Sequence, residues 1–489
     1  MGQFADQALT AERLLALTGG WEARRGPRYL ALADAIADAA LQEELADGTA
    51  LPPERALAQH AALSRGTVVA AYAELAERGL VERRRGSGTR LRTGLAPSGG
   101  RALRSAQLAR AVRGGGDGLI DFSFGAPSCD EVVDDLAAST ADALRAGAPL
   151  HGYAPLGLPA LRAAVADRLT AAGAPTDAEE ILVTTGAQGA LQLICAALVR
   201  RGDRVVVEAP TYPGAIELFS RAGAHVLAVR RDHAGPRPDD LARALGGPGA
   251  ALVFLVPTCH NPTGSIVPEG RRRELLRICA EHEVLVVEDL TMGDVTFGAP
   301  VPPSLTALAT GPVVTVGSFS KVLWGGLRTG WVRADRALAL RLGRLKAAQD
   351  LGSGLLDQTA VLATLPRYDE VVATRRRQAS ERYGVMAAAL AETLPDWRHE
   401  APRGGWSLWA ELPRPVADEL AVCAIRHGVA IATGSGSAPD DLFPSHVRLC
   451  FPGEPAVIRE GVRRLAAAWE ETQEAGRPAK RASNAVAWS

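Results

Sequence analysis

Residues 22–92 carry a helical pattern of apolar positions that gives way to a strand pattern. Apolar residues recur every three or four positions over residues 29–46, which predicts an amphipathic helix. A short helix is expected over residues 55–60, and a longer one over residues 64–77, which opens with a serine, a favourable helix cap. Residues 80–92 then alternate as two short strands about a Gly-Ser-Gly turn. This order predicts a winged helix-turn-helix, which is a DNA-binding fold.

A different pattern fills residues 118–475. Five apolar runs (ILVTT, RVVVEA, ALVFLVP, VLVVED and PVVTVGS) alternate with longer helical stretches. Because strands that alternate with helices form right-handed crossovers, the pattern predicts an α/β fold with a mostly parallel, buried sheet. Residues 93–117 contain flanking glycines and no large apolar cluster, and are interpreted as a linker. Residues 476–489 are predicted to form a disordered tail.

The composition is that of a globular protein and limits the possible partners. The 489 residues are 47% hydrophobic and 22% charged, and the formal net charge is −1, so any affinity for nucleic acid has to be local. The start lacks a signal-peptide pattern, and no apolar run approaches the ~18 residues of a membrane span, so a cytoplasmic protein without membrane contact is expected. Cys259 lies beside His260 without further spaced ligands, and no metal site is expected.

Positive charge in the first domain gathers where DNA is expected to lie. Five arginines and no acidic residue occur between residues 83 and 92. Arg55 and Arg65 open the two helices of the helix-turn-helix, where phosphates or base edges are met. A solvated basic hairpin is the alternative. The order of the elements, taken with the charge, favours a double-stranded DNA operator as partner.

Lysine is almost absent from the chain, which draws attention to Lys321. The sequence contains three lysines, Lys321, Lys346 and Lys480, among 54 lysines and arginines. Lysine can condense with an aldehyde, whereas the guanidinium of arginine stays protonated and cannot. Lys321 lies in VGSFSKVLWGGLRTGW, after hydroxyl residues and seven positions before Arg328. This context predicts a Schiff-base lysine beside a bound phosphate rather than a surface lysine.

Polar and aromatic side chains that could bind a ligand follow the apolar runs. In a parallel sheet, the residues that follow the strands lie together at one edge. After ILVTT, a glycine turn opens a helix whose first N–H groups, at Gly186, Ala187 and Gln188, can hold a phosphate. Tyr212 follows RVVVEAP and offers a flat face to a heteroaromatic ring. Each position alone is also compatible with ordinary turn chemistry or packing.

The remaining runs end in groups that suit a pyridine ring. Asn261 follows ALVFLVP and can donate to a phenolate oxygen, and Asp289 ends VLVVED, where it can keep a pyridine nitrogen protonated. Ser318, Ser320 and Arg328 surround Lys321 in the sequence and can contact the same phosphate. The order of these groups, more than any one of them, indicates a cofactor site.

These residues resemble a known architecture. From Asp121 onward the chain resembles a fold-type-I aminotransferase, with a large and a small subdomain and pyridoxal 5′-phosphate (PLP) as cofactor. The first ninety residues resemble a GntR-type winged helix. Together they resemble the MocR-type transcriptional regulators, in which these two parts are fused.

The resemblance implies a role for each candidate residue. Lys321 is expected to form the Schiff base, Asp289 to pair with the pyridine nitrogen and Asn261 to bond the ring hydroxyl. The other cofactor-binding residues are expected to be Gly186, Ala187, Gln188, Tyr212, Ser318, Ser320, Arg328 and, from the neighbouring subunit, Tyr153. Arg448, in HVRLCF, is expected to bind an effector carboxylate. The DNA-binding residues are expected to be Arg55, Ser64, Arg65, Thr67, Arg84, Arg85 and Arg90.

Three positions depart from the family pattern. Thr291 stands where family members commonly carry a tyrosine that bonds the ring hydroxyl, so that oxygen relies more on Asn261. Gly214 replaces a basic residue that some relatives use to grip an effector. Gly66 replaces a larger polar residue at the start of the recognition helix, where base contacts are expected to be weaker.

Two functions share this site. The resemblance favours a PLP-dependent regulator that senses an amine, an amino acid or the cofactor itself, because an arginine-rich wing has no evident use in transamination. The alternative is a working aminotransferase with a DNA-binding arm. A scaffold with a vestigial pocket would not need Lys321, Asp289 and Arg328 together. The resemblance also implies a homodimer with exchanged arms.

Overall fold

A computed structural model of the chain describes residues 9–18, 21, 27–41, 49–77, 80–84, 88–91, 118–127, 140–141, 151–247, 249–298, 300–440 and 442–475. The chain divides into two compact units, Met1–Ser105 and Ala106–Ser489. The predicted linker, residues 93–117, and the predicted tail, residues 476–489, lie outside the described residues, so both stay predictions.

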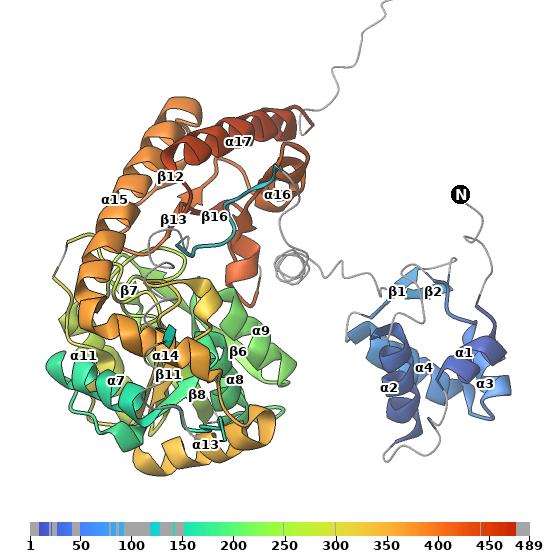
Figure 1. The fold of residues 1–489 in the computed structure, drawn as a ribbon. Coiled ribbons are helices and arrows are strands. Elements are labelled where there is room, and N and C mark those ends of the chain that lie inside the picture. The colour runs from blue at the N-terminus through green and yellow to red at the C-terminus, as the bar shows by residue number, and fades with distance from the viewer. Residues whose placement is uncertain are drawn as a thin grey trace, which may run out of the picture. The chain divides into compact units, whose positions relative to one another are not determined.

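The first unit has the predicted order of helices and hairpin (Figure 1). Its elements are α1 (Ala11–Leu17), α2 (Arg28–Leu41), α3 (Glu54–His60), α4 (Arg65–Glu77), β1 (Val81–Arg84) and β2 (Gly88–Leu91). The strands pair antiparallel, with Val81 opposite Leu91. Apolar faces of the helices form one core, and Tyr72 at its edge donates from its hydroxyl to the Pro52 carbonyl at 2.8 Å. The winged helix-turn-helix is confirmed, and α1 is an element that the sequence did not predict.

The second unit is built on a sheet of eight strands in the order β4-β11-β10-β9-β8-β5-β6-β7. The strands are β4 (Ile181–Thr184), β5 (Arg204–Ala209), β6 (His225–Asp232), β7 (Gly235–Pro236), β8 (Ala250–Leu255), β9 (Leu285–Asp289), β10 (Val313–Ser318) and β11 (Gly330–Arg333). Neighbours from β10 through β6 pair in parallel, whereas β11 runs antiparallel to β10 and β4. The prediction of a mostly parallel sheet is confirmed.

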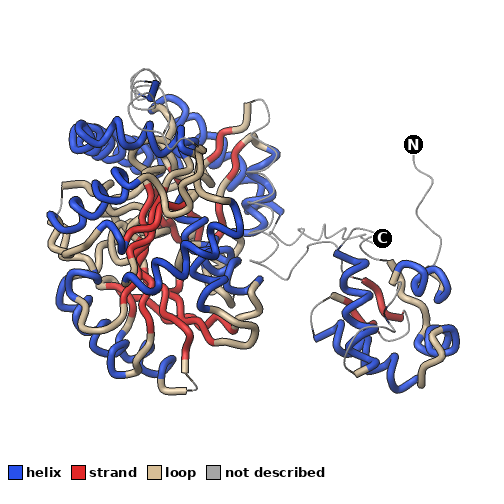
Figure 2. The backbone as a smooth tube through the Cα atoms, turned by 60° about the horizontal axis from the view of Figure 1, so that its bottom comes forward, coloured by secondary structure: helices blue, strands red, loops and turns tan. Residues whose placement is uncertain are grey.

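Helices cover both faces of this sheet (Figure 2). They are α7 (Pro159–Ala171), α8 (Gly186–Leu198), α9 (Pro213–Arg221), α10 (Pro238–Leu245), α11 (Glu269–Glu281), α12 (Leu305–Leu308), α13 (Arg336–Asp350) and α14 (Leu355–Thr364), with the short 3₁₀ helices η2 (Ala178–Glu180), η3 (Gly325–Leu327) and η4 (Leu365–Arg367). In β5, Val205 and Val207 pack into one apolar cluster and Val206 into another. Successive side chains of a strand point to opposite faces, so both faces are buried and the strands are continuously apolar.

A smaller subdomain holds a four-stranded sheet in the order β12-β13-β16-β15. Its elements are β12 (Arg398–His399), β13 (Ser407–Glu411), β15 (Ala432–Thr433), β16 (His446–Cys450), η5 (Gly434–Ser437) and the helices α15 (Tyr368–Thr393), α16 (Ala417–Arg426) and α17 (Pro455–Ala475). A separate pair joins β14 (Val429–Ala430) to β3 (Ile120–Asp121). Helices α15 and α17 pack against each other (Figure 1). None of the described helices is long and apolar enough to cross a membrane.

Candidate functional site

Lys321 lies just beyond the carboxyl end of β10. Strand β9 pairs in parallel with β10, placing Asp289 opposite Val316, so both strands deliver their following residues to one edge. The Lys321 ammonium donates to the Gly125 carbonyl at 2.7 Å, and the Trp406 indole N–H donates to the Lys321 carbonyl at 3.0 Å. Segments distant in sequence therefore hold this lysine at the predicted edge.

The surroundings of Lys321 lower the pKa of its amine. Burial lowers the pKa of Lys321 to about 8, and the positive charges of Arg448 and Arg328 act in the same direction. Asp289 opposes this shift of the pKa but does not cancel it. A neutral amine is the form that attacks an aldehyde, so the site activates Lys321 as a nucleophile.

Asp289 is a buried carboxylate at the end of β9. Its side chain is 5% exposed, and its Oδ1 accepts from the Thr291 backbone N–H at 2.7 Å. Burial raises the pKa of Asp289, while hydrogen bonds from the Thr291 side chain and backbone N–H, together with the charge of Lys321, pull the pKa down. The Thr291 hydroxyl is buried beside this carboxylate.

The start of α8, Arg328 and two serines form a site suited to a phosphate. Gly186 opens α8 at φ +70°, and Thr185 before it makes no side-chain cap hydrogen bond, so the first N–H groups are available to an anion. Arg328 donates to the Thr185 carbonyl at 3.1 Å. The positive φ of Gly186 favours glycine, and the missing Cβ leaves room for the Arg328 guanidinium beside it. The Ser318 and Ser320 hydroxyls bond each other at 3.0 Å.

Tyr212 lies at the start of α9 and joins the phosphate turn. Its hydroxyl donates to Gln188 Oε1 at 3.0 Å. Burial raises the pKa of this hydroxyl, and the nearby Asp289 carboxylate raises it further. A Cβ at Gly214 would lie 2.6 Å from the Tyr212 ring. The departure at Gly214 therefore has a local reason, because the glycine gives the tyrosine ring its space.

Arg448, on β16, links the two subdomains at the site. One Nη donates to Asn261 Oδ1 at 3.0 Å and the other to the Ser123 carbonyl at 2.7 Å. The Arg448 Nε is buried without a partner among the described residues. Since Asn261 uses its oxygen toward Arg448, its amide N–H groups remain as donors.

Gly125 and Ser123 are functional positions that sequence reasoning missed. Both act through backbone carbonyls in the loop after β3, one toward Lys321 and the other toward Arg448. Main-chain acceptors leave no residue-type signal, so nothing in the sequence singles them out.

Tyr153 is not brought to the site within one chain. Its side chain is 57% exposed, and its ring stacks on His151 with the centroids 6.0 Å apart. Its expected role at a neighbouring subunit stays a prediction.

The candidate DNA-binding residues fall on the helix-turn-helix and the hairpin. The Ser64 hydroxyl accepts from the Thr67 N–H at 3.1 Å and caps α4, as the sequence predicted. Arg65 opens α4 and lies 3.5 Å from the Glu54 carboxylate. Arg55 lies on α3 and Arg90 on β2, both exposed. Arg84 ends β1, and Arg85 lies outside the described residues.

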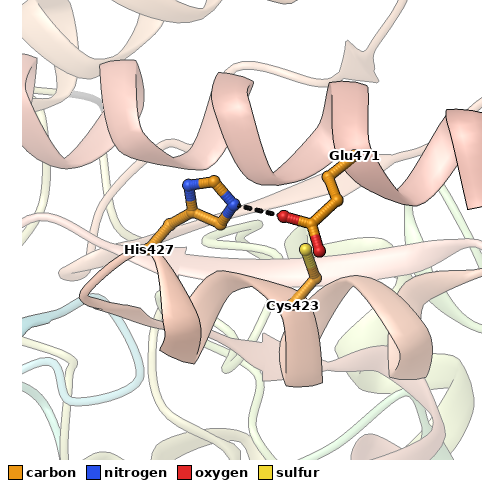
Figure 3. Close-up of side chains that lie close together, drawn as sticks. All are labelled: Cys423, His427 and Glu471. Carbon is orange, nitrogen blue, oxygen red and sulfur yellow. Dashed lines mark hydrogen bonds and ion pairs between the residues drawn. The ribbon is translucent and has the colours of Figure 1, made fainter.

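One group in the described residues has the ligand types of a metal site. Cys423, His427 and Glu471 place one ligand atom each within 4.8 Å of the others, between α16 and α17 (Figure 3). However, Arg426 donates to Glu471 and, at 3.5 Å, to the Cys423 sulfur. His427 Nε2 lies 2.8 Å from Glu471. Because a guanidinium already supplies the positive charge, we interpret the group as an ion pair that joins the two helices.

A cavity of about 430 Å³ lies next to the site but does not contain it. Its lining includes Leu290, Asp294, Ser318 and Phe319, which neighbour Asp289 and Lys321 in sequence, whereas those two residues do not line it. The site is therefore defined by its side chains at the sheet edge and not by this cavity.

Comparison with known families agrees with the division of the chain into two units. Residues 117–465 match the family model described as aminotransferase class I and II, and residues 28–91 match that of the bacterial regulatory proteins of the gntR family. The first match spans Lys321 and the groups around it, and the second spans the winged helix-turn-helix.

Individual relatives fall into two kinds. The chain is 33% identical to a 2-aminoadipate transaminase of Thermus thermophilus, covering 71% of this chain and 89% of that protein. It is 28% identical to the probable rhizopine catabolism regulatory protein MocR of Rhizobium meliloti, covering 92% and 95%. A solved structure of LysN, the alpha-aminoadipate aminotransferase of Thermus thermophilus complexed with N-(5′-phosphopyridoxyl)-L-leucine, matches with TM-score 0.71 and 30% identity, covering 76% of this chain and 96% of that one.

Proposed function

The chain belongs to the aminotransferase class I and II family and carries a gntR-family domain ahead of it, and on this premise we propose that it is a PLP-dependent transcriptional regulator. This is the architecture of the MocR-type regulators, and the similarity to MocR extends over both units. The single observation that carries the proposal is the occurrence, in one chain, of a DNA-binding fold and a buried lysine, Lys321, at the sheet edge of an aminotransferase fold.

The residues present fit PLP. When bound, PLP supplies an aldehyde that condenses with amines and a ring that withdraws electrons. The start of α8 and Arg328 bind its phosphate, with Ser318 and Ser320 beside them. Asp289 would pair with the ring nitrogen and keep it protonated, and the amide N–H of Asn261, whose oxygen accepts from Arg448, would donate to the ring hydroxyl. The Thr291 hydroxyl stands in place of the tyrosine common in the family and lies beside the Asp289 carboxylate.

The effector of this site is an amine or amino acid, or the cofactor itself. Arg448 has a buried Nε without a partner among the described residues, so its guanidinium has a donor left for a carboxylate. Binding at Lys321 alters the affinity of the winged helix for its operator. A coupling of about 1–3 kcal/mol changes that affinity 5- to 150-fold. A protein that acts on the chromosome works in the cytoplasm, so the expected location is part of this proposal.

A working aminotransferase with a DNA-binding arm is the second candidate. The observation in its favour is the complete chemical site, together with the similarity to a 2-aminoadipate transaminase over 71% of the chain. Formation of keto acid from an amino acid at useful rates would favour this candidate over a pure sensor.

The experiment that tests the regulator is a DNA titration of the PLP-loaded protein. Fragments that flank its own gene are titrated with and without candidate amines while the cofactor absorbance is recorded. The proposal expects tight binding to one fragment, and an amine that changes both the absorbance and the DNA affinity. Spectral changes that never alter DNA affinity would contradict it.

A homodimer is the assembly that this proposal requires. Tyr153 is exposed within one chain, and several large apolar side chains are exposed on the second unit, Leu356 at 60% among them. Burying apolar surface of this kind favours association, and in the dimer Tyr153 completes the site of the partner. Exchange of the N-terminal arms between subunits belongs to the same proposal. A monomer in sedimentation at assay concentrations would contradict it.

Capture of PLP should depend on pH through the pKa of Lys321. The neutral amine is the nucleophile, so below pH 8 the capture rate is expected to rise about tenfold per pH unit, and to level off above the pKa of about 8. An ordinary lysine would keep gaining rate to beyond pH ~10. Stopped-flow absorbance after mixing PLP with cofactor-free protein measures this. A capture rate that still rises about tenfold per pH unit well above pH ~8 would show that the pKa of Lys321 is not lowered as assigned.

The basic wing should set part of the salt dependence of DNA binding. Arg84→Ala with Arg85→Ala is expected to lower the slope of log affinity against log salt by about one for each arginine that touches a phosphate. The matched control is Arg273→Ala with Arg277→Ala, because both side chains are exposed on α11 of the other unit. An unaltered slope for the wing variant would move the phosphate contact elsewhere.

A further inference from the structure

A buried polar network lies beneath the turn that carries Asn261. Glu208, near the end of β5, forms an ion pair with Arg231 of β6, and both side chains are almost fully buried. The second carboxylate oxygen of Glu208, Oε1, accepts from the Val256 N–H at 2.5 Å. The network therefore ties the ends of three adjacent strands together, β5, β6 and β8.

The network continues into the turn through hydroxyl groups. Arg231 donates to the Ser265 hydroxyl at 2.8 Å, and that hydroxyl lies 2.8 Å from the Thr263 hydroxyl. Thr263 in turn lies 2.8 Å from Nδ1 of His260, whose Nε2 is 3.4 Å from the Glu208 carboxylate. The contacts close a ring from Arg231 to Glu208 around the turn.

The protonation of this ring is settled by burial and donor count. The His260 imidazole is fully buried beside the Arg231 cation, which keeps its pKa well below the ordinary value, so the imidazole is neutral with one N–H. The Pro210 carbonyl also accepts a hydrogen bond from this imidazole, and the Glu208 carboxylate lies 3.4 Å from Nε2, so we assign the N–H to Nε2 and the acceptor role toward Thr263 to Nδ1. Arg231 can only donate, so the hydrogen bonds run in one direction through Ser265 and Thr263 to His260.

The ring borders the proposed cofactor site on two sides. Asn261 lies between His260 and Thr263 in the turn, and its amide faces Arg448. Glu208, in β5, lies four residues before Tyr212, which follows the end of that strand. A shift of the turn would therefore move the donor for the cofactor ring hydroxyl and the contact to Arg448 together.

We propose that the Glu208–Arg231–Ser265–Thr263–His260 ring is a positioning device that holds the Asn261 amide toward the cofactor ring. Its members touch neither cofactor nor effector, and they act through the conformation of the turn. This inference rests on the proposed use of PLP. It assigns a role to a buried ion pair whose contribution to stability alone is weakly supported, because desolvation offsets the attraction between the charges.

Thr263 is the position at which to break the ring, because valine has nearly the same shape without the hydroxyl. Thr263→Val is expected to raise the Kd for PLP about fivefold, as the loss of one hydrogen bond implies. The cofactor absorbance of the PLP-loaded protein changes with pH, and the midpoint of that change is expected to rise by about half a pH unit. A weaker hydrogen bond from Asn261 stabilises the negative ring oxygen less, so the proton between that oxygen and the Lys321 nitrogen is held more tightly. Thr263→Ser keeps a hydroxyl and should restore both values.

The matched control is Thr472→Val, which removes a part-buried threonine hydroxyl that donates to the Ala468 carbonyl at 2.7 Å on α17, away from the site. It should leave the Kd and the pH midpoint as in the wild type. If Thr263→Val does not fold, Ser265→Ala breaks the same ring and is expected to shift both values in the same directions.

The outcomes separate the two levels of the proposal. If the wild-type protein with added PLP shows no absorbance band that PLP alone lacks, the proposed function itself is overturned. A wild type that shows the band, with the Thr263→Val or Ser265→Ala variant matching Thr472→Val in Kd and pH midpoint, would overturn the positioning role alone. The positioning role would also be wrong if the variant lost thermal stability while its Kd for PLP and its pH midpoint stayed unchanged. That result would mean that the ring only stabilises the fold.

Discussion

Lys321→Ala is expected to abolish the visible absorbance of the protein in the presence of PLP. The change removes the one primary amine among the described residues at the sheet edge, which contacts the Gly125 carbonyl and has its pKa lowered to about 8. Lys346 is buried and paired with Asp350 at 2.6 Å, so it is not expected to replace Lys321. Lys480 lies outside the described residues.

The absorbance spectrum of the purified variant with excess PLP, compared with PLP alone, measures this effect. Lys480→Ala is the control and should keep the band at wild-type intensity. The affinity of Lys321→Ala for its operator should no longer respond to an amine. Persistence of the band in Lys321→Ala would remove this lysine from its role.

Arg448→Ala is expected to weaken the binding of effectors that carry a carboxylate by about 30- to 4,000-fold. Truncating one partner of a buried, hydrogen-bonded charge pair costs about 2–5 kcal/mol, which converts to that range. The affinity for PLP should fall by only about fivefold, because the variant loses the single hydrogen bond to Asn261 on that side.

Spectral titration with an amino acid and with the matching amine that lacks the carboxylate separates the two effects. The amine should bind the wild type and Arg448→Ala about equally. Arg448→Lys retains the charge but loses the planar fork, so it should recover part of the affinity for the amino acid. Equal affinities of wild type and Arg448→Ala for the amino acid would discard the assignment.

The central strands were predictable because of where they lie in the sheet. The five apolar runs became β4, β5, β8, β9 and β10, which are apolar almost throughout because they are buried on both faces. Strand β6 contains two arginines and is partly exposed, and β11, with the sequence GWVR, mixes a glycine and an arginine with two apolar residues, so neither formed a recognisable run. In the small sheet the strands either have two residues or mix polar and apolar residues, as in SLWAE and HVRLC, so they formed no continuous apolar run either.

The candidate site also contains some residues that the sequence indicated and others that it did not. Side chains at the end of a buried strand, such as Asp289, could be placed at this edge from the sequence because topology brings strand ends together. The backbone carbonyls of Ser123 and Gly125 and the ring around His260 were not found, because they depend on contacts between distant segments. Gly214 appeared from the sequence only as a lost basic residue, whereas the structure shows that it gives the Tyr212 ring its space.

Reduction of the PLP-loaded protein with borohydride, followed by peptide mapping, tests the central claim most directly. The chain has three lysines, so the attachment point can be read without ambiguity. One phosphopyridoxyl group per chain is expected, on the peptide that contains Lys321, with the peptides of Lys346 and Lys480 unmodified. A protein that remains unlabelled, or a label on either of the other two lysines, would contradict the account.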